Sequence, residues 1–247
     1  MLKLALLLLC LAVLWWSVRN DAAEYAAFKR LTDTRDRQRC YRNWIVKGFL
    51  AFSGTTLACL LVLQRVRAVA ALPAEFYPLA WFLRSVLPAA EMPGKSFLAG
   101  FASAGVVTGI LLGVVLAKKL KVKHKTLGDI EPLMPRNGAE TGWTALLSIN
   151  AGVSEELFFR LLLPLLLVSV LHHTVPAFVA ATILFGLVHR YQGAVGVIAT
   201  TVLGGAFAGL YLWTGSLWIT MAAHAGLDLV GLVVRPTLTR LLHRPAA

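Results

Sequence analysis

Long apolar stretches constrain this chain more than any other feature. A helix that crosses a hydrocarbon core of about 30 Å needs around 20 mostly apolar residues, with about 17 as the lower limit. Seven stretches meet or approach that length, and they lie near residues 2–18, 46–64, 97–117, 143–171, 176–189, 194–213 and 217–234. Lipid offers no partners to backbone polar groups, so each stretch must be helical. We therefore predict an all-α, polytopic transmembrane helix bundle of about seven spans.

Composition and charge agree with a membrane protein. The 247 residues are 58% apolar, and 24 basic residues stand against 12 acidic ones. The bases gather between apolar stretches, from Arg19 to Lys47 and again from Lys118 to Lys125, as the positive-inside rule expects for cytoplasmic segments. The excess of bases therefore needs no nucleic acid to explain it. If these clusters and the tail with Arg235, Arg240 and Arg244 face the cytoplasm, seven spans place the N-terminus outside and the C-terminus in the cytoplasm.

The chain divides into three regions without a separate soluble domain. Residues 1–142 hold N-terminal spans and basic loops, with a proline-interrupted segment at 65–96 that we expect to be interfacial or re-entrant. Residues 143–234 hold ionisable side chains within apolar runs, and residues 235–247 form a basic cytoplasmic tail. In the sixth span, Gly205 and Gly209 have a small-xxx-small spacing, which predicts a close helix contact.

Three acidic residues, Glu155, Glu156 and Asp228, lie inside apolar runs. A charge at the bilayer centre costs at least about 2.5–3.5 kcal/mol, so such residues usually face a cavity or a partner. Glu156 precedes Arg160 by four positions, the favourable orientation for a helical ion pair, so this pair can be structural support. Glu155 lies about 100° around the helix from Glu156 and is left as the free carboxylate. The alternative is an interfacial helix whose acids point to water.

Two later spans carry histidines at helical spacing from a second notable residue. Phe185 and His189 share a helix face through i,i+4 spacing, and so do His224 and Asp228. Each pair by itself fits an interfacial histidine or a satisfied buried pair. The order Glu-Glu-xxx-Arg, Phe-xxx-His, His-xxx-Asp on successive spans is far more specific.

These motifs resemble the three motifs of the CPBP family, the CAAX-protease and bacteriocin-processing intramembrane endopeptidases. The resemblance covers about residues 143–234 and implies hydrolysis of a peptide bond in a membrane-associated protein or peptide. It implies that Glu155 and His189 activate water, and that His224 and Asp228 stabilise the oxyanion. The third motif more often ends in asparagine, so hydrogen-bond donation from Asp228 depends on its protonation.

Other readings of the same residues stay open. A glutamate-type mechanism needs no cofactor, but Glu155, His189 and His224 would also make a three-ligand zinc site of a metalloprotease. Intramembrane Glu, His and Asp also build the proton relays of coupled transporters. A rhomboid-like serine protease using Ser154 is disfavoured by Glu155, which stands where that pattern wants glycine. The protein could also be a non-catalytic immunity or scaffold member of the family, with the same fold but no activity. Compact loops favour a bacterial inner membrane protein.

Overall fold

The computed structural model describes residues 1–87 and 128–242. Within these residues the chain is helical and contains no strand. The N-terminal part comprises α1 (Leu2–Val18), α2 (Asp21–Lys29), α3 (Thr34–Gly48), η1 (Phe49–Gly54), α4 (Thr55–Val62), η2 (Val66–Val69), η3 (Ala74–Phe76) and α5 (Tyr77–Val86). The second part comprises η4 (Glu131–Leu133), α7 (Gly138–Glu156), η5 (Leu157–Leu162), α8 (Leu163–Leu171), α9 (Thr174–Val188), η6 (Arg190–Gln192), α10 (Gly193–Thr214), α11 (Leu217–Leu229), η7 (Val230–Val234) and α12 (Arg235–Leu242).

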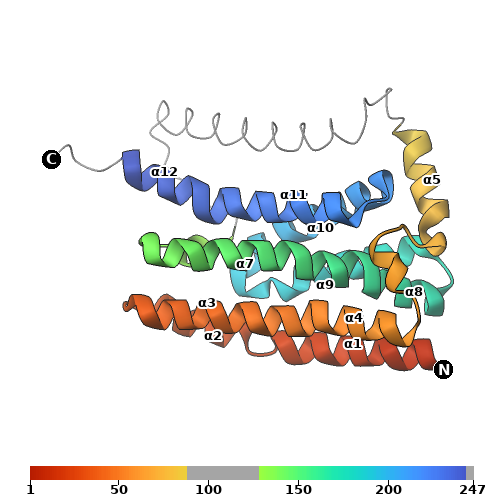
Figure 1. Ribbon diagram of the computed structural model, residues 1–247, viewed down its shortest axis with the longest axis horizontal. Helices are drawn as coiled ribbons and strands as arrows, with labels where there is room; N and C mark the ends of the chain where they lie inside the picture. The colour runs from red at the N-terminus through yellow and green to blue at the C-terminus, as the bar shows by residue number, and fades with distance from the viewer. Residues whose placement is uncertain (88–127, 243–247) are drawn as a thin grey trace.

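The long helices lie side by side along one direction, while α5 crosses one end of the bundle (Figure 1). Among the described residues, four helical runs are long and apolar enough to cross a membrane: Leu2–Lys29, Thr34–Val62, Arg190–Thr214 and Leu217–Arg240. The run from α7 through α8 is longer still, but it carries Glu155, Glu156 and Arg160 in its middle. The fold is therefore that of a helical membrane protein.

Several helices extend beyond the predicted spans. The second begins at Thr34 rather than near residue 46, because the basic segment continues the same helix. The last continues through α12 to Leu242, so the first residues of the predicted tail are helical. The predicted span at 97–117 lies outside the described residues. Of the segment at 65–96, the described part forms two short 3₁₀ turns and α5.

Three of the long helices contain a π-helical insertion. These are η1 between α3 and α4, η5 between α7 and α8, and η7 between α11 and α12. A π-turn adds a residue to the turn and rotates the side chains that follow, and such insertions are frequent at functional sites. Here η5 follows Glu156 directly, and η7 begins two residues after Asp228.

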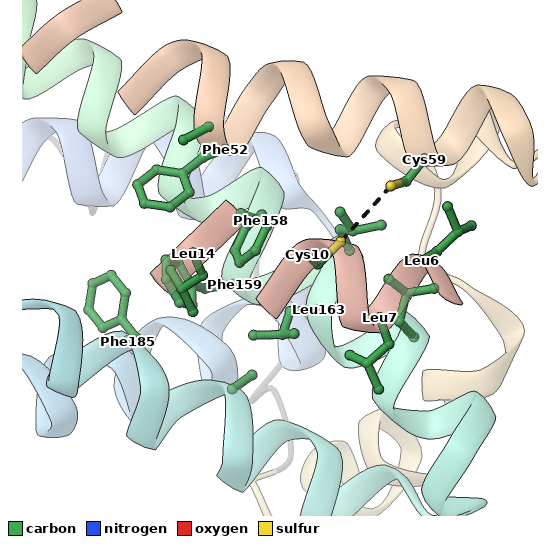
Figure 2. Close-up of a cluster of buried hydrophobic side chains, with 14 residues drawn as sticks. Leu6, Leu7, Cys10, Leu14, Phe52, Cys59, Phe158, Phe159, Leu163 and Phe185 are labelled. Atoms are coloured by element: carbon green, nitrogen blue, oxygen red, sulfur yellow. Dashed lines mark hydrogen bonds between the residues drawn. The ribbon is translucent and has the colours of Figure 1, made fainter. Parts of the chain in front are cut away.

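A continuous apolar cluster joins the N-terminal helices to the second part of the chain. Figure 2 shows Cys10 and Leu14 of α1 and Phe52 of η1 beside Phe158 and Phe185. The sulfur atoms of Cys10 and Cys59 lie 3.9 Å apart, although no motif in the sequence relates the two. The tight packing of this cluster holds α1 and α4 against η5 and α9.

A buried ion pair makes the second connection between the two parts. Arg37 of α3 donates from Nε to Glu140 of α7 at 3.1 Å, and both side chains are at most 1% exposed. The guanidinium also donates to the Tyr41 hydroxyl and to the carbonyls of Pro132 and Met134. The basic segment is thus not wholly a solvated cytoplasmic face, because one of its arginines is structural.

The segment after α4 is fixed by a bidentate ion pair. Arg65 donates from its two terminal nitrogens to the two carboxylate oxygens of Glu75, at 2.8 and 2.9 Å. These hydrogen bonds hold the pKa of Glu75 below its ordinary value. The Thr174 hydroxyl donates to the Glu75 carbonyl, which ties the segment to the start of α9.

Removal of the Arg37 side chain should destabilise the protein strongly. Arg37→Met leaves the Glu140 carboxylate buried and unpaired, a change that typically costs about 3–5 kcal/mol. The double variant Arg37→Met/Glu140→Leu removes both charges and should recover most of that loss. Arg39→Met is the matched control, because Arg39 is 68% exposed and surface pairs contribute about 0–1 kcal/mol. Equilibrium unfolding in mixed micelles measures all three, and equal losses for Arg37→Met and Arg39→Met would contradict the assignment.

Candidate active site

The site begins at the C-terminal end of α7, where Glu155 and Glu156 stand side by side. Helix α7 starts at Asn137, whose side chain accepts from the Glu140 N–H as an N-cap. It packs closely on α11 because Gly152 faces Ala225: a Cβ at residue 152 would lie 2.5 Å from the Ala225 nitrogen. This close approach brings the two carboxylates to the side chains of α11.

His224 of α11 connects the carboxylates. Its Nδ1 donates to Glu156 Oε1 at 2.7 Å, and Glu156 is fully buried. Its Nε2 lies 3.9 Å from Glu155 Oε2 and 3.8 Å from Asp228 Oδ2. The His224–Asp228 pairing is the one that the i,i+4 spacing predicts. The ring therefore has one nitrogen anchored and the other facing two carboxylates.

Arg160 completes the support beneath the carboxylates. Its Nε lies 3.1 Å from Glu156 Oε2, so the ion pair predicted from the spacing is present. The side chain is 2% exposed, and its guanidinium lies over the Phe185 ring, 4.1 Å from the centroid. Glu156 thus gives one oxygen to Arg160 and the other to His224. Glu155 Oε2 and Glu156 Oε2 are both buried without a hydrogen bond among the described residues. Glu155 has no guanidinium beside it, and the nearest charged partner of its Oε2 is His224 Nε2 at 3.9 Å.

His189 reaches the site from the C-terminal end of α9. Its Nδ1 lies 2.8 Å from the Phe185 carbonyl oxygen, which can only accept, so Nδ1 carries the hydrogen. In the neutral ring Nε2 is then the basic nitrogen. The Phe185 ring lies 4.9 Å from the His189 ring and 6.0 Å from the His224 ring. Phe185 therefore packs against both histidines and Arg160.

The four ionisable residues line one cavity of about 580 Å³. Glu155, His189, His224 and Asp228 form one part of its wall. Another part comes from the N-terminal helices, with Ser17, Val18, Asp21, Tyr25, Trp44, Lys47, Gly48 and Phe52. This wall was not predicted, because no motif relates residues 1–142 to the charged spans.

Phe207 is another residue of the site that the spacing of the motifs did not predict. Its ring stacks on the His224 imidazole at a centroid distance of 4.8 Å and an interplanar angle of 20°. Phe207 lies on α10, and no regular spacing relates it to the motif on α11. The stacking fixes the plane of the ring whose Nδ1 is already held by Glu156.

Ser154 does not have the surroundings of a serine nucleophile. Its hydroxyl donates to Asn150 Oδ1 at 3.2 Å and accepts from the Ser53 hydroxyl at 2.9 Å. The side chain is 1% exposed. Its proton is directed to an amide oxygen rather than to a histidine, so the arrangement is structural and links η1 to α7.

The side chains at the site do not match the geometry of a metal centre. Within residues 1–87 and 128–242, no group of three His, Cys, Asp or Glu side chains is placed to hold a metal ion. Glu155, His189 and His224 line the same cavity but do not converge on one point. The ligand set of the zinc alternative therefore does not fit this arrangement.

The glycines that allow close packing differ from those that the spacing predicted. A Cβ at Gly204 would lie 2.8 Å from the Phe185 ring, and one at Gly186 would lie 1.8 Å from the Thr201 hydroxyl. Gly205 has only ordinary contacts, and Gly209 has nothing within 4 Å among the described residues. The small-xxx-small contact is therefore not made at Gly205 or Gly209, whereas Thr201, one turn earlier in the same spacing, does pack closely against Gly186. The true contacts bring α10 against α9 beside Phe185 and His189.

Comparison with known families identifies this region. Residues 137–230 match the family model described as type II CAAX prenyl endopeptidase Rce1-like. The match supports the CPBP family of CAAX proteases and agrees with the resemblance of the three motifs. No match was found among curated proteins or among solved structures. The chain is thus an integral membrane protein, and its residues 137–230 are similar to a family of prenyl endopeptidases.

Filling the space at Gly152 should force α7 away from α11. Gly152→Ala places a Cβ against the Ala225 backbone, and overpacking of this kind costs about 1–3 kcal/mol. Gly142→Ala on the same helix meets nothing within 4 Å and should be neutral or stabilising by up to about 1 kcal/mol. Thermal unfolding in detergent distinguishes the two. Equal melting temperatures for both variants would show that the helices do not meet at residue 152.

Proposed function

We propose that this protein is an intramembrane endopeptidase that hydrolyses a peptide bond of a membrane-anchored protein or peptide. The observation that carries the proposal is a single cavity lined by Glu155, His189, His224 and Asp228. Glu156, which pairs with Arg160 and His224, does not line this cavity, whereas Glu155 does. The Rce1-like family match agrees with protease chemistry.

Glu155 and His189 are the groups that activate water. A water molecule between the Glu155 carboxylate and His189 Nε2 transfers a proton to the carboxylate as its oxygen attacks the scissile carbonyl carbon. The resulting tetrahedral intermediate collapses when the leaving amine receives that proton. Positioned general bases of this kind contribute about 10²–10⁴ in rate. This is a glutamate-type mechanism, in which no step passes through a metal.

His224 and Asp228 stabilise the oxyanion. Glu156 and Phe207 fix the His224 ring, so its Nε2–H, when present, points to the cavity and not to the protein backbone. Such preorganised donors contribute about 10²–10³ in rate. Asp228 adds a second donor when its carboxyl is protonated. Glu156, Arg160 and Phe185 hold these groups in position.

The proposed function also implies an orientation of the bundle in the membrane of a bacterium. The start of α1 lies at the end of the bundle opposite to α12, while the α2–α3 junction and α12 share one end (Figure 1). These last segments carry basic residues, so we propose that their end is cytoplasmic, with seven spans and the N-terminus outside. In this arrangement residues 143–234 form the catalytic core, residues 1–142 complete the cavity, and the bacterial inner membrane is the location.

Two substitutions should abolish cleavage. Purified protein in lipid is offered a panel of membrane-anchored peptides, and Glu155→Gln and His189→Ala should each lower kcat by about 10²–10⁴ because the water loses its base. Glu131→Gln is the matched control, since Glu131 lies in η4, outside the cavity wall. Cleavage that persists unchanged in both site variants would show that the site is wrong. Proton flux into liposomes that depends on Glu155, without cleavage, would favour a transporter.

Asp228→Asn should retain cleavage and change its pH dependence. In the wild type, donation from Asp228 is lost as the carboxyl deprotonates, so kcat should fall as pH rises through that titration. An asparagine amide donates at every pH. The variant should therefore lose the part of the decline that Asp228 causes, so its kcat should fall less with rising pH than that of the wild type. The measurement is kcat of both proteins between about pH 5 and pH 9. An equal decline in both would show that Asp228 does not donate to the oxyanion.

A further inference from the structure

One aromatic residue of the cavity is not explained by the mechanism above. Tyr191 lies in η6, two residues after His189, and its ring centroid is 6.0 Å from the His189 ring. It lines the same cavity as Glu155 and Asp228. It belongs to none of the three motifs, since it follows the second motif in a separate 3₁₀ turn.

The Tyr191 hydroxyl accepts one hydrogen bond, and its own hydrogen is available to donate. Gln192 Nε2 donates to the Tyr191 hydroxyl oxygen at 3.0 Å, which uses one lone pair of the phenol. Among the described residues, no acceptor takes the phenolic hydrogen. A second cavity tyrosine behaves differently, because Tyr25 donates its hydrogen to the Asp129 carbonyl. Tyr191 is therefore the tyrosine of this wall that can donate to a ligand.

The turn that carries Tyr191 is held at several points. Gln192 N–H donates to the His189 carbonyl at 2.9 Å, and Asp129 N–H donates to the Gln192 carbonyl at 3.0 Å. Arg190 donates to the carbonyls of Val18 and Arg19 at the end of α1. The Tyr191 ring also meets the Tyr25 ring edge-on at 5.0 Å. A donor on a fixed turn loses little freedom when a substrate binds.

We infer that Tyr191 is a further catalytic residue, whose phenolic O–H donates to the carbonyl oxygen of the scissile bond as that oxygen gains charge. The inference rests on the proposed peptidase function and adds a donor from the His189 side of the cavity. The phenol keeps its proton throughout, so no bond to it is made or broken. Its contribution is a stronger hydrogen bond in the transition state than in the bound substrate.

The test compares two tyrosine-to-phenylalanine variants on the panel peptide that the wild type cleaves fastest. Tyr191→Phe should lower kcat by about 10²–10³, with KM within about threefold of the wild type, because the donor acts mainly in the transition state. Tyr211→Phe is the matched control: the Tyr211 hydroxyl is buried, has no described hydrogen-bond partner and lies outside the cavity. That variant should keep the wild-type kcat.

Each outcome decides the question. A Tyr191→Phe variant with unchanged kcat, while Glu155→Gln is inactive, overturns the role of Tyr191 and leaves the proposed function intact. A rise in KM without loss of kcat also overturns it, since it makes Tyr191 a ground-state contact. A melting temperature lowered together with kcat assigns the residue to structure instead. A Glu155→Gln variant that keeps the wild-type kcat overturns the proposed function, and the Tyr191 role with it.

Discussion

The fold depends on one carboxylate that is buried completely and shared between two partners. Glu156 offers Oε2 to Arg160 on the next turn of its own helix and Oε1 to His224 on another helix. In an apolar bundle an unpaired charge is strongly destabilising, so the three side chains are stable only together. This requirement fixes the rotation of α11 relative to α7. It also determines which nitrogen of His224 faces the cavity.

Close backbone packing provides the space for this arrangement. Gly152 lets α11 approach α7, and Gly186 and Gly204 let α10 approach α9. The approach of α10 brings Phe207 over the His224 ring, while Phe185 fills the space between the histidines and Arg160. Aromatic rings or hydrogen bonds thus hold Arg160, His189 and His224. Glu155 makes no hydrogen bond through Oε2, and His224 Nε2 lies 3.9 Å from that oxygen.

The sequence correctly predicted the side-chain contacts that follow from spacing along one helix. Glu156 and Arg160 share one turn, as do His224 and Asp228, so their contacts follow from helical geometry. The hydrogen bond between Glu156 and His224 joins residues 68 positions apart, and only the motif order placed them in one site. The Gly204 contact was missed by one residue, because a small-residue spacing leaves open which face meets a neighbour. Arg37 was counted among the cytoplasmic bases because a count of charges does not distinguish a solvated arginine from a buried one.

The cavity has walls of two different kinds. Its motif-bearing wall falls within the segment that matches the family, whereas α1, α2 and α3 supply the facing residues, among them Trp44 and Lys47. Changes in those helices alter the shape of the cavity and leave the ionisable cluster in place. Proteins with the same three motifs but unrelated N-terminal helices therefore share chemistry without sharing a cavity. In such a protein, the N-terminal helices, which a motif search does not detect, determine what fits inside the cavity.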